Sequence, residues 1–370
     1  MKSIVPFIAF MSFLCCCSER KGDRSVSIIM ENDHEIIVTS LNSLKPDTAI
    51  IPLSSLVEDC TFVQLEFTEE ALFNPWWTTI TDKYIGVLQE EGSYKLFDRS
   101  GKFLCNVGSV GQGPGEYRTT LYDDIIDDKN ELIYLIPFGG DKILVYNTSG
   151  QFLKNLNTPQ MMSPRLFLSD DILTVIFKPN MSNESGVIQI DVATEQILNE
   201  WSTQIAWQGY EDGIFGIRNE PTRFNIAHEL NDTLYRIDVK NNTIAPFFAI
   251  SYNSSEKLYK GFCKLNQDLV MTFTEQGIVA TDLKHKTASW VKVVNDYYGN
   301  LDVKVSLVSF YNGYFVQNIQ PEQLMDDIEQ RLTEQTCTEK DRQILQKTLS
   351  SLKENTNNVV FIGKLKKDYE

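Results

Sequence analysis

Few residues of the types that carry out catalysis stand at the spacings that catalysis requires. The histidines His34, His228 and His285 are far apart, and none belongs to a nucleophile motif such as Gly-x-Ser-x-Gly. Sialidase-type Asp boxes are absent, and no pattern defines a carboxylate pair for acid–base catalysis. The sequence therefore predicts no catalytic residues. A metal-dependent lactonase, which would collect Glu, Asn and Asp ligands from distant parts of the chain, remains an alternative.

Two other segments invite ligand-binding interpretations. Four aspartates lie close together at Asp123, Asp124, Asp127 and Asp128. They lack the spacing and the glycine of a calcium loop, so we interpret them as a solvated acidic face. The glycine-rich segment 108–115 could present backbone amides to an anion, but it lacks the phosphate-loop residues and the dinucleotide spacing. We expect its glycines to allow positive φ in a tight crossing. We predict neither a metal nor a cofactor.

The net charge and the cysteines narrow the class of protein. A formal net charge of −16 and a pI near 4.7 disfavour binding to nucleic acid and binding to anionic lipid through a basic patch. Beyond residue 17 the cysteines are Cys60, Cys105, Cys263 and Cys337, which lack metal-ligand spacing and could pair in three ways. A chain of this length does not need disulfides to hold a core, so we interpret them as buried free thiols.

A polar turn recurs along the chain at a nearly constant interval. The segment Phe97–Phe103 joins two strands through Asp-Arg-Ser-Gly, and Tyr146–Phe152 repeats it closely. The marker residues of the series are Asp98, Asn147, Asp191, Asp238 and Asp282, with spacings of 49, 44, 47 and 44. A period near 45 residues that holds several short strands is typical of one four-stranded propeller blade. A β-sandwich with coincidental spacing is the alternative.

The predicted fold is all-β, a six-bladed β-propeller of four-stranded antiparallel blades over residues 51–370. A propeller must join its first and last blades, or both would expose unpaired strand edges. The strand at Phe62–Phe67 precedes blade one and has no other partner. We therefore predict that this strand completes blade six as its outer strand.

A helical hairpin at about residues 321–354 interrupts the last predicted blade. Leu324, Ile328 and Leu332 recur every four residues and form an apolar stripe. A second apolar stripe follows Thr338, which we predict to be the N-cap of the second helix. We expect the hairpin to pack on one face of the propeller. Contact with a partner protein is the alternative.

The first residues have the features of a targeting segment. In residues 1–17, a short apolar run ends at Leu14 and is too short to span a membrane as a mature helix. Cys17 lies three residues after Leu14, which resembles the acylation site of a bacterial lipoprotein signal. Acylation at Cys16 and an ordinary secretion signal are the alternatives. We expect a lipid anchor at Cys17, followed by a tether over residues 18–50 that contains one strand at Glu35–Val38.

The glycine-rich segment carries the clearest family signal. Gly108–Tyr117 resembles the Gly-x-Gly-Pro-Gly-Glu-Tyr stretch of the six-bladed, NHL-like β-propeller lipoproteins of Bacteroides-type gut bacteria. Further matches in the same order are Ile51–Ser54 with Val63–Glu66, Asn231–Tyr235 and Ile362–Leu365. The resemblance covers about residues 48–365 and departs at Asn74–Trp77 and in the length of the helical insertion. It implies a propeller, lipid anchoring and an envelope location, and it implies no reaction.

Aromatic and arginine residues in the loops that enter the blades are the candidate ligand-binding residues. They combine flat apolar area with directed hydrogen bonds, which suits sugars and peptides. The candidates are Trp76, Trp77, Tyr117, Arg118, Arg165, Trp207, Tyr210 and Arg223. Packing between blades is the alternative role for each of them.

The expected protein is a monomeric, non-enzymatic binding lipoprotein of the bacterial cell envelope. We expect it in the outer membrane, facing the periplasm or the cell surface, with a glycan, peptide or protein as its ligand. The functional alternatives are a propeller hydrolase or lyase acting on a glycan or lactone, and an accessory subunit of an outer-membrane uptake complex.

Overall fold

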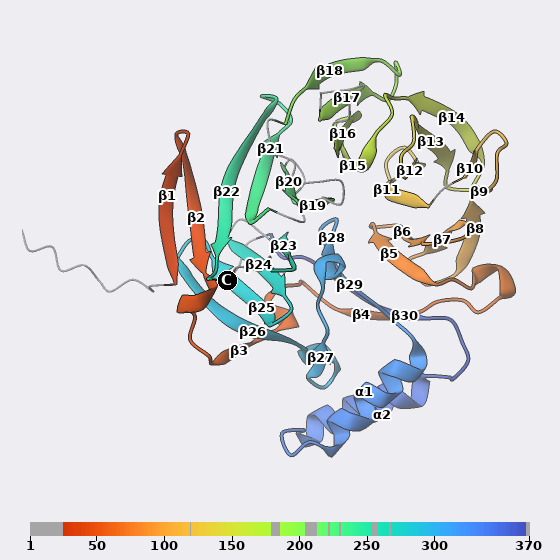
Figure 1. The fold of residues 1–370 in the computed structure, drawn as a ribbon. Coiled ribbons are helices and arrows are strands. Elements are labelled where there is room, and N and C mark those ends of the chain that lie inside the picture. Colours follow the sequence, from red (N-terminus) through yellow and green to blue (C-terminus); the bar gives the residue numbers. More distant parts are fainter. Residues whose placement is uncertain are drawn as a thin grey trace, which may run out of the picture.

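The computed structural model describes residues 25–118, 120–178, 186–203, 213–220, 223–228, 231–253, 258–265 and 268–367. These residues form a six-bladed β-propeller, as the sequence predicts. Figure 1 shows the blades as small twisted sheets that follow one another around a ring, with the first strand of each blade near the middle. The core strands of each blade are antiparallel and follow chain order outward from the centre, except that the outer strand of the last blade comes from an earlier part of the chain.

The first three blades contain four strands each. Blade one consists of β5 (Pro75–Ile80), β6 (Tyr84–Gln89), β7 (Tyr94–Asp98) and β8 (Phe103–Val107). Blade two consists of β11 (Leu121–Asp127), β12 (Leu132–Pro137), β13 (Lys142–Asn147) and β14 (Phe152–Asn157). Blade three consists of β15 (Met162–Ser169), β16 (Ile172–Lys178), β17 (Val187–Asp191) and β18 (Ile197–Trp201). Between blades one and two, β9 (Ser109–Val110) and β10 (Glu116–Tyr117) pair in parallel.

The last three blades recruit strands from the N-terminal part of the chain. Blade four consists of β19 (Ile214–Glu220), β20 (Arg223–His228), β21 (Thr233–Asp238) and β22 (Thr243–Ser251). Blade five consists of β23 (Lys260–Lys264), β24 (Leu269–Thr274), β25 (Gly277–Asp282) and β26 (Thr287–Asn295), extended by β27 (Leu301–Val303). Blade six consists of β28 (Phe310–Tyr311), β29 (Tyr314–Ile319), β30 (Val359–Lys364) and β4 (Thr61–Gln64).

The recurring polar turn contains Asp or Asn because this side chain accepts the same backbone hydrogen bonds in successive blades. The Asp98 carboxylate accepts from the backbone N–H of Ser100 at 2.8 Å and of Lys102 at 3.1 Å. Asn147 accepts in the same way from the backbone of the corresponding turn in blade two. Gly101 has φ 89°, and a Cβ added there would lie 2.4 Å from the Gln64 carbonyl oxygen of the preceding blade. The glycine is therefore required both by backbone conformation and by close packing between blades.

The ring closes as the sequence predicts. Strand β4 pairs antiparallel with β30, with Val63 opposite Val360 and Phe62 opposite Phe361. The outer strand of the last blade therefore comes from the start of the propeller, which removes the free edge that β30 would otherwise present.

The tether expected over residues 18–50 is wrong from Val26 onward, although a strand does form at Glu35–Val38 as expected. Strands β1 (Val26–Glu31) and β2 (His34–Ser40) form a hairpin, and β2 pairs in parallel with the outer strand of blade four. Strand β3 (Thr48–Pro52) pairs in parallel with the outer strand of blade five. Figure 1 shows the hairpin, in red, standing beside β22. This segment belongs to the fold because Ile36 and Ile37 bury their side chains.

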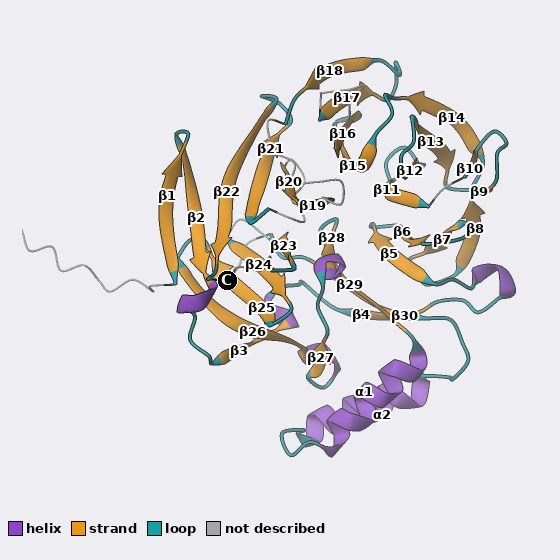
Figure 2. Cartoon of the chain, viewed as in Figure 1, coloured by secondary structure: helices purple, strands orange, loops and turns teal. Residues whose placement is uncertain are grey.

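The helical insertion packs against the propeller. Helices α1 (Pro321–Thr333) and α2 (Glu339–Ser351) form the helical hairpin seen at the lower edge of Figure 2. Leu324, Ile328 and Leu345 are buried in one cluster with residues of blades five and six. The Thr338 hydroxyl accepts from the backbone N–H of Asp341 at 3.2 Å, which confirms the predicted N-cap. Neither helix is long and apolar enough to span a membrane, and no other helix of the described residues is.

Candidate functional site

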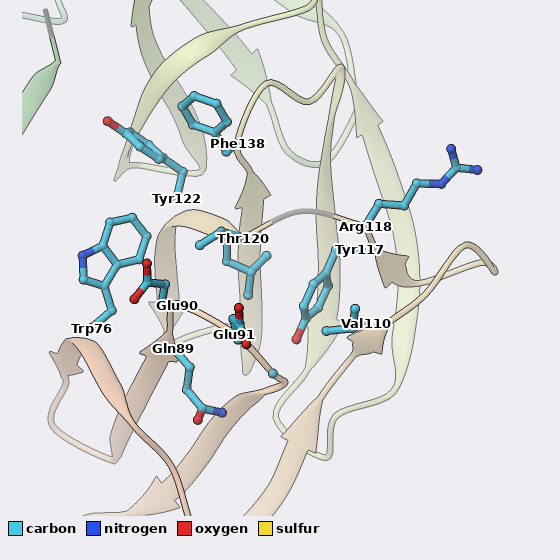
Figure 3. A pocket seen from close by; sticks show the side chains of 12 residues that line it. Trp76, Gln89, Glu90, Glu91, Val110, Tyr117, Arg118, Thr120, Tyr122 and Phe138 are labelled. Carbon is cyan, nitrogen blue, oxygen red and sulfur yellow. The ribbon is translucent and has the colours of Figure 1, made fainter. Parts of the chain in front are cut away.

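A cavity of about 830 Å³ opens between blades one and two, on the face where the chain passes from one blade to the next. It is built from the β6–β7 turn, the crossing from β8 to β11, and the ends of β5 and β12. The lining residues are Trp76, Gln89, Glu90, Glu91, Gly92, Val110, Tyr117, Arg118, Thr120, Leu121, Tyr122 and Phe138 (Figure 3). Its volume lies within the range of about 300–1,000 Å³ that is usual for small-ligand sites. We call it the entry-face cavity.

Three aromatic side chains form one wall of the entry-face cavity. The rings of Trp76 and Tyr122 lie 6.2 Å apart in an edge-on arrangement, and those of Tyr122 and Phe138 lie 5.3 Å apart. Trp76 is 43% exposed and Phe138 is 40% exposed. Figure 3 shows the three rings side by side. This aromatic wall, Trp76, Tyr122 and Phe138, offers apolar contact area that is still open to solvent.

Two carboxylates lie beside the aromatic wall, on the turn between β6 and β7. Glu90 and Glu91 are exposed, and neither forms a hydrogen bond or an ion pair with another described residue. Gln89, by contrast, is bonded within the fold. Its amide nitrogen donates to the Ser93 carbonyl at 2.5 Å and its amide oxygen accepts from the Asn74 backbone N–H at 3.1 Å. Gln89 thus holds the turn against the segment that leads into Trp76.

The glycine-rich segment forms the opposite wall and has a structural role. The Glu116 carboxylate accepts from the Gly113 backbone N–H at 2.6 Å, and this bond lowers the pKa of Glu116. At Gly115, φ is 72° and an added Cβ would lie 2.5 Å from the Phe152 side chain. The chain therefore crosses between blades here in a conformation that requires glycine, as expected from the sequence. The Gly113 amide is bonded to the chain's own carboxylate.

Two predicted binding residues follow the glycine-rich segment. Tyr117 is only 2% exposed, and its hydroxyl accepts from the Tyr94 backbone N–H at 2.9 Å. The Tyr117 ring therefore lines the cavity, while its hydroxyl is bonded to the backbone of β7 in blade one. Arg118 is exposed and donates to the Gln112 side chain at 3.1 Å. Figure 3 shows the Arg118 guanidinium directed away from the aromatic wall.

Trp77 and Arg165 lie in the central channel rather than among the residues that line the cavity. Arg165 is 5% exposed and donates from Nε to the Ile214 carbonyl at 2.7 Å. Its guanidinium lies 4.3 Å from the centre of the Tyr122 ring and 5.6 Å from that of Trp77. The Trp77 ring packs edge-on against Tyr311 of blade six at 4.9 Å. These contacts link the inner strands of different blades.

Three of the four clustered aspartates, Asp123, Asp124 and Asp127, are buried, so the expectation of a solvated face is wrong for them. Asp123 forms a buried ion pair with Arg218 at 3.3 Å and accepts from the Leu166 backbone N–H at 2.7 Å. Asp124 accepts from the Thr79 hydroxyl at 2.9 Å and from the Tyr94 hydroxyl at 2.7 Å. Burial, and next the Asp123 charge, raise the pKa of Asp124 to about 6. Both carboxylates are committed to bonds between blades.

The other two aspartates of the cluster also stabilise loops. Asp127 accepts from the backbone N–H groups of Lys129 and Asn130 at 3.0 and 3.2 Å. Asp128 accepts from the Thr81 hydroxyl of blade one at 2.7 Å. On the inner strand β11, Asp123 and Asp124 can be buried because groups of other blades satisfy their carboxylates.

The remaining predicted residues lie elsewhere. Arg223 lines a second cavity, of about 770 Å³, which does not share any lining residue with the first. The Nε atom of Arg223 lies 3.9 Å from a carboxylate oxygen of Glu220. Trp207 and Tyr210, like the predicted lipidation site Cys17, lie outside the described residues.

The entry-face cavity thus unites three of the predicted residues, Trp76, Tyr117 and Arg118. Sequence reasoning missed Tyr122, Phe138, Glu90 and Glu91. Glu90 and Glu91 precede Gly92, a residue typical of turns, so the sequence could have marked their loop. Tyr122 directly precedes the acidic cluster. Nothing local in the sequence indicates that these loops converge.

The part of the chain that the structure describes contains neither a group of metal-ligating side chains nor a disulfide. No group of three or more His, Cys, Asp or Glu side chains there is arranged to hold a metal ion. Cys60, Cys105, Cys263 and Cys337 are free. Burial raises the pKa of both Cys60 and Cys263 to about 12, which keeps these thiols protonated.

Comparisons with known proteins agree with the fold. A protein of Bacteroides fragilis NCTC 9343 that is named as a predicted exported protein superposes with a TM-score of 0.60 at 17% identity, covering 86% of this chain and all of that one. A member of the duf4221 family from Bacteroides vulgatus ATCC 8482 has a TM-score of 0.45 at 11% identity, covering 93% of this chain and 99% of its own. No curated protein matches the sequence. A family model described as a domain of unknown function matches residues 36–269, and the chain therefore belongs to the DUF4934 family.

Proposed function

We propose that the protein is a non-enzymatic binding lipoprotein of the bacterial cell envelope, an NHL-like propeller whose ligand occupies the entry-face cavity. The observation that carries this proposal is the aromatic wall of Trp76, Tyr122 and Phe138, open to solvent beside two exposed carboxylates. Large exposed aromatic side chains gathered at a cavity mark binding sites on soluble proteins.

The scaffold supports binding because it holds the cavity in place. Trp76 and Tyr122 lie on inner strands of adjacent blades, and the loops on both sides are held by backbone N–H groups that donate to the side chains of Gln89 and Glu116. A preformed site loses less conformational entropy when a ligand binds than a site on mobile loops. The channel carboxylates Asp123 and Asp124 are already bonded within the fold, so they support a structural role more than a catalytic one.

The experiment that tests ligand binding compares two aromatic truncations. We expect Trp76→Ala to weaken binding of any ligand of the mature domain by at least about tenfold, because an aromatic anchor in a binding site commonly contributes about 2 kcal/mol. Phe67→Ala is the matched control, since Phe67 is 55% exposed and does not line the cavity. A screen by thermal shift, followed by calorimetry, measures both. Ligands that bind both variants equally would contradict the proposal.

The anchor is proposed from the sequence around Leu14 and Cys17. The Bacteroides fragilis neighbour is itself named as a predicted exported protein, which agrees with an envelope location. We expect Cys17→Ser to release the protein from the membrane fraction, because a cleaved and acylated cysteine would be the attachment point. Cys16→Ser, which leaves Cys17 in place, should remain membrane-bound. Fractionation followed by immunoblotting measures both, and retention of the Cys17 variant in membranes would contradict the anchor.

A further inference from the structure

We propose that the entry-face cavity selects a positively charged group, an ammonium or guanidinium from a small amine or from a basic side chain of a peptide. This inference rests on the proposed function, since it assumes that the cavity binds a ligand. It adds the charge and the chemical class of that ligand. The carrying observation is the pairing of the aromatic wall with the carboxylates of Glu90 and Glu91.

The charged groups that line the cavity favour a cation. Glu90 and Glu91 have no hydrogen-bond or ion-pair partner among the described residues, so their charges are available to a ligand. Arg118 is the one basic residue of the lining, and it donates to Gln112 and is directed away from the aromatic wall (Figure 3). An anionic ligand would therefore meet two like charges with little compensation.

The aromatic wall already packs one cation within the fold. The guanidinium of Arg165 lies 4.3 Å from the centre of the Tyr122 ring, a distance at which the ring quadrupole attracts a positive charge. Arg165 makes this contact from β15 of blade three, where its side chain is buried. The rings of Trp76 and Phe138 retain exposed surface, so a second cation can contact them from the solvent side.

Glu90 lines the same cavity as this exposed aromatic surface. Figure 3 shows its carboxylate between Trp76 and Thr120, below the ring of Tyr122. A cation placed there would contact ring faces and a carboxylate together, which is how aromatic cages recognise ammonium groups. The net charge of −16 adds a long-range field that steers cations toward the protein.

The test is calorimetric titration of the mature domain with four probes at low and high salt. The probes are spermidine, a tetralysine peptide, cellotetraose and trigalacturonic acid. We expect spermidine or tetralysine to bind, and to bind at least tenfold more weakly to Glu90→Gln/Glu91→Gln and to Trp76→Ala. Raising the salt from 0.05 to 0.5 M, chosen to shorten the Debye length from roughly 14 to 4 Å, should also weaken binding. Which of the two binds tells whether a free amine or a peptide is the source.

The matched control separates the cavity from the overall field. Glu329→Gln/Glu354→Gln removes the same charge from two exposed residues that do not line the cavity, and it should bind the cationic probe as the unmodified protein does. An equal loss in both double variants would overturn the inference, because the effect would come from net charge alone.

The remaining outcomes distinguish this inference from the proposed function. Binding of cellotetraose or trigalacturonic acid that depends on Trp76 and not on the glutamates would overturn the cationic class and retain the cavity as a binding site. Binding of no probe, or binding that does not depend on Trp76, would overturn the cationic class and count against the cavity itself.

Discussion

Adjacent residues of one strand have different roles in this protein. Trp76 and Trp77 follow each other in β5, at the point where the register against β6 shifts between Pro75 and Trp77. Trp76 lines the entry-face cavity, whereas Trp77 packs against Tyr311 and Arg165 in the channel. The sequence singles out both residues, but only their positions on the inner strand separate the cavity-lining residue from the inter-blade contact.

The buried carboxylate of Asp124 makes stability depend on pH. Its pKa is raised to about 6 in the folded protein, above the value of about 3.9 for an unfolded chain. The folded state therefore holds this proton more tightly, so the contribution of Asp124 to stability is fully present below about pH 4 and is lost as the pH rises through 6.

We expect Asp124→Asn to remove this part of the pH dependence. Between pH 4 and pH 7, the free energy of unfolding of the unmodified protein should fall by about 2–3 kcal/mol relative to the variant. Urea titrations at several pH values measure the difference. Glu329→Asn, at an exposed position of α1, is the control and should follow the unmodified protein. A constant difference between the Asp124 variant and the unmodified protein over this range would contradict the expectation.

At the scale of elements, the helical hairpin is part of the core as well as a surface feature. Leu324 and Ile328 of α1 and Leu345 of α2 share one buried cluster with Phe361 of the last blade. Removing the hairpin would therefore expose apolar area of blades five and six. A loss of partner binding after its deletion would not by itself identify a docking surface.

Substitutions within the helical hairpin separate its two faces. We expect Ile328→Ala to lower the free energy of unfolding by about 2–5 kcal/mol, because Ile328 is fully buried and truncation leaves a cavity. Gln330→Ala, at an exposed position of the same helix, should change it by less than about 0.5 kcal/mol. Urea denaturation measures both. Equal, small effects would mean that α1 does not pack on the propeller.

At the scale of the whole molecule, the N-terminal strands hold the ring together. Strands β1, β2 and β3 extend blades four and five at their outer edges, and β4 completes blade six. The chain that precedes blade one therefore adds strands to blades four, five and six, which come last in the sequence. Closure of this kind couples the ends of a repeat structure, whose repeats otherwise contact only their neighbours.

A nested series of truncations tests this closure. A chain that starts at residue 25 keeps all four strands and should unfold as cooperatively as the longer mature chain. A start at residue 47 removes β1 and β2 and should lower stability by several kcal/mol, because Phe248 loses the cover that Ile37 and Leu41 provide. A start at residue 67 also removes β3 and β4, exposes the edge of β30 and should cause aggregation. Light scattering and urea denaturation measure the series, and equal behaviour of all three chains would contradict it.

The sequence by itself determined the features that depend on local chemistry. The Asp and Asn turns, the glycine crossing, the Thr338 cap and the period near 45 residues each follow from hydrogen bonds or backbone angles within a few residues. Because such constraints recur with each blade, the number of blades and the closing strand were predictable as well.

Only the tertiary structure decided which of these residues share a site. The entry-face cavity joins Trp76 of blade one to Phe138 of blade two, and the Asp123–Arg218 pair joins blade two to blade four. The hairpin of β1 and β2 likewise joins blade four, some 200 residues away along the chain. Contacts between distant segments depend on how the blades close around the channel, and no local pattern of residue types encodes that geometry.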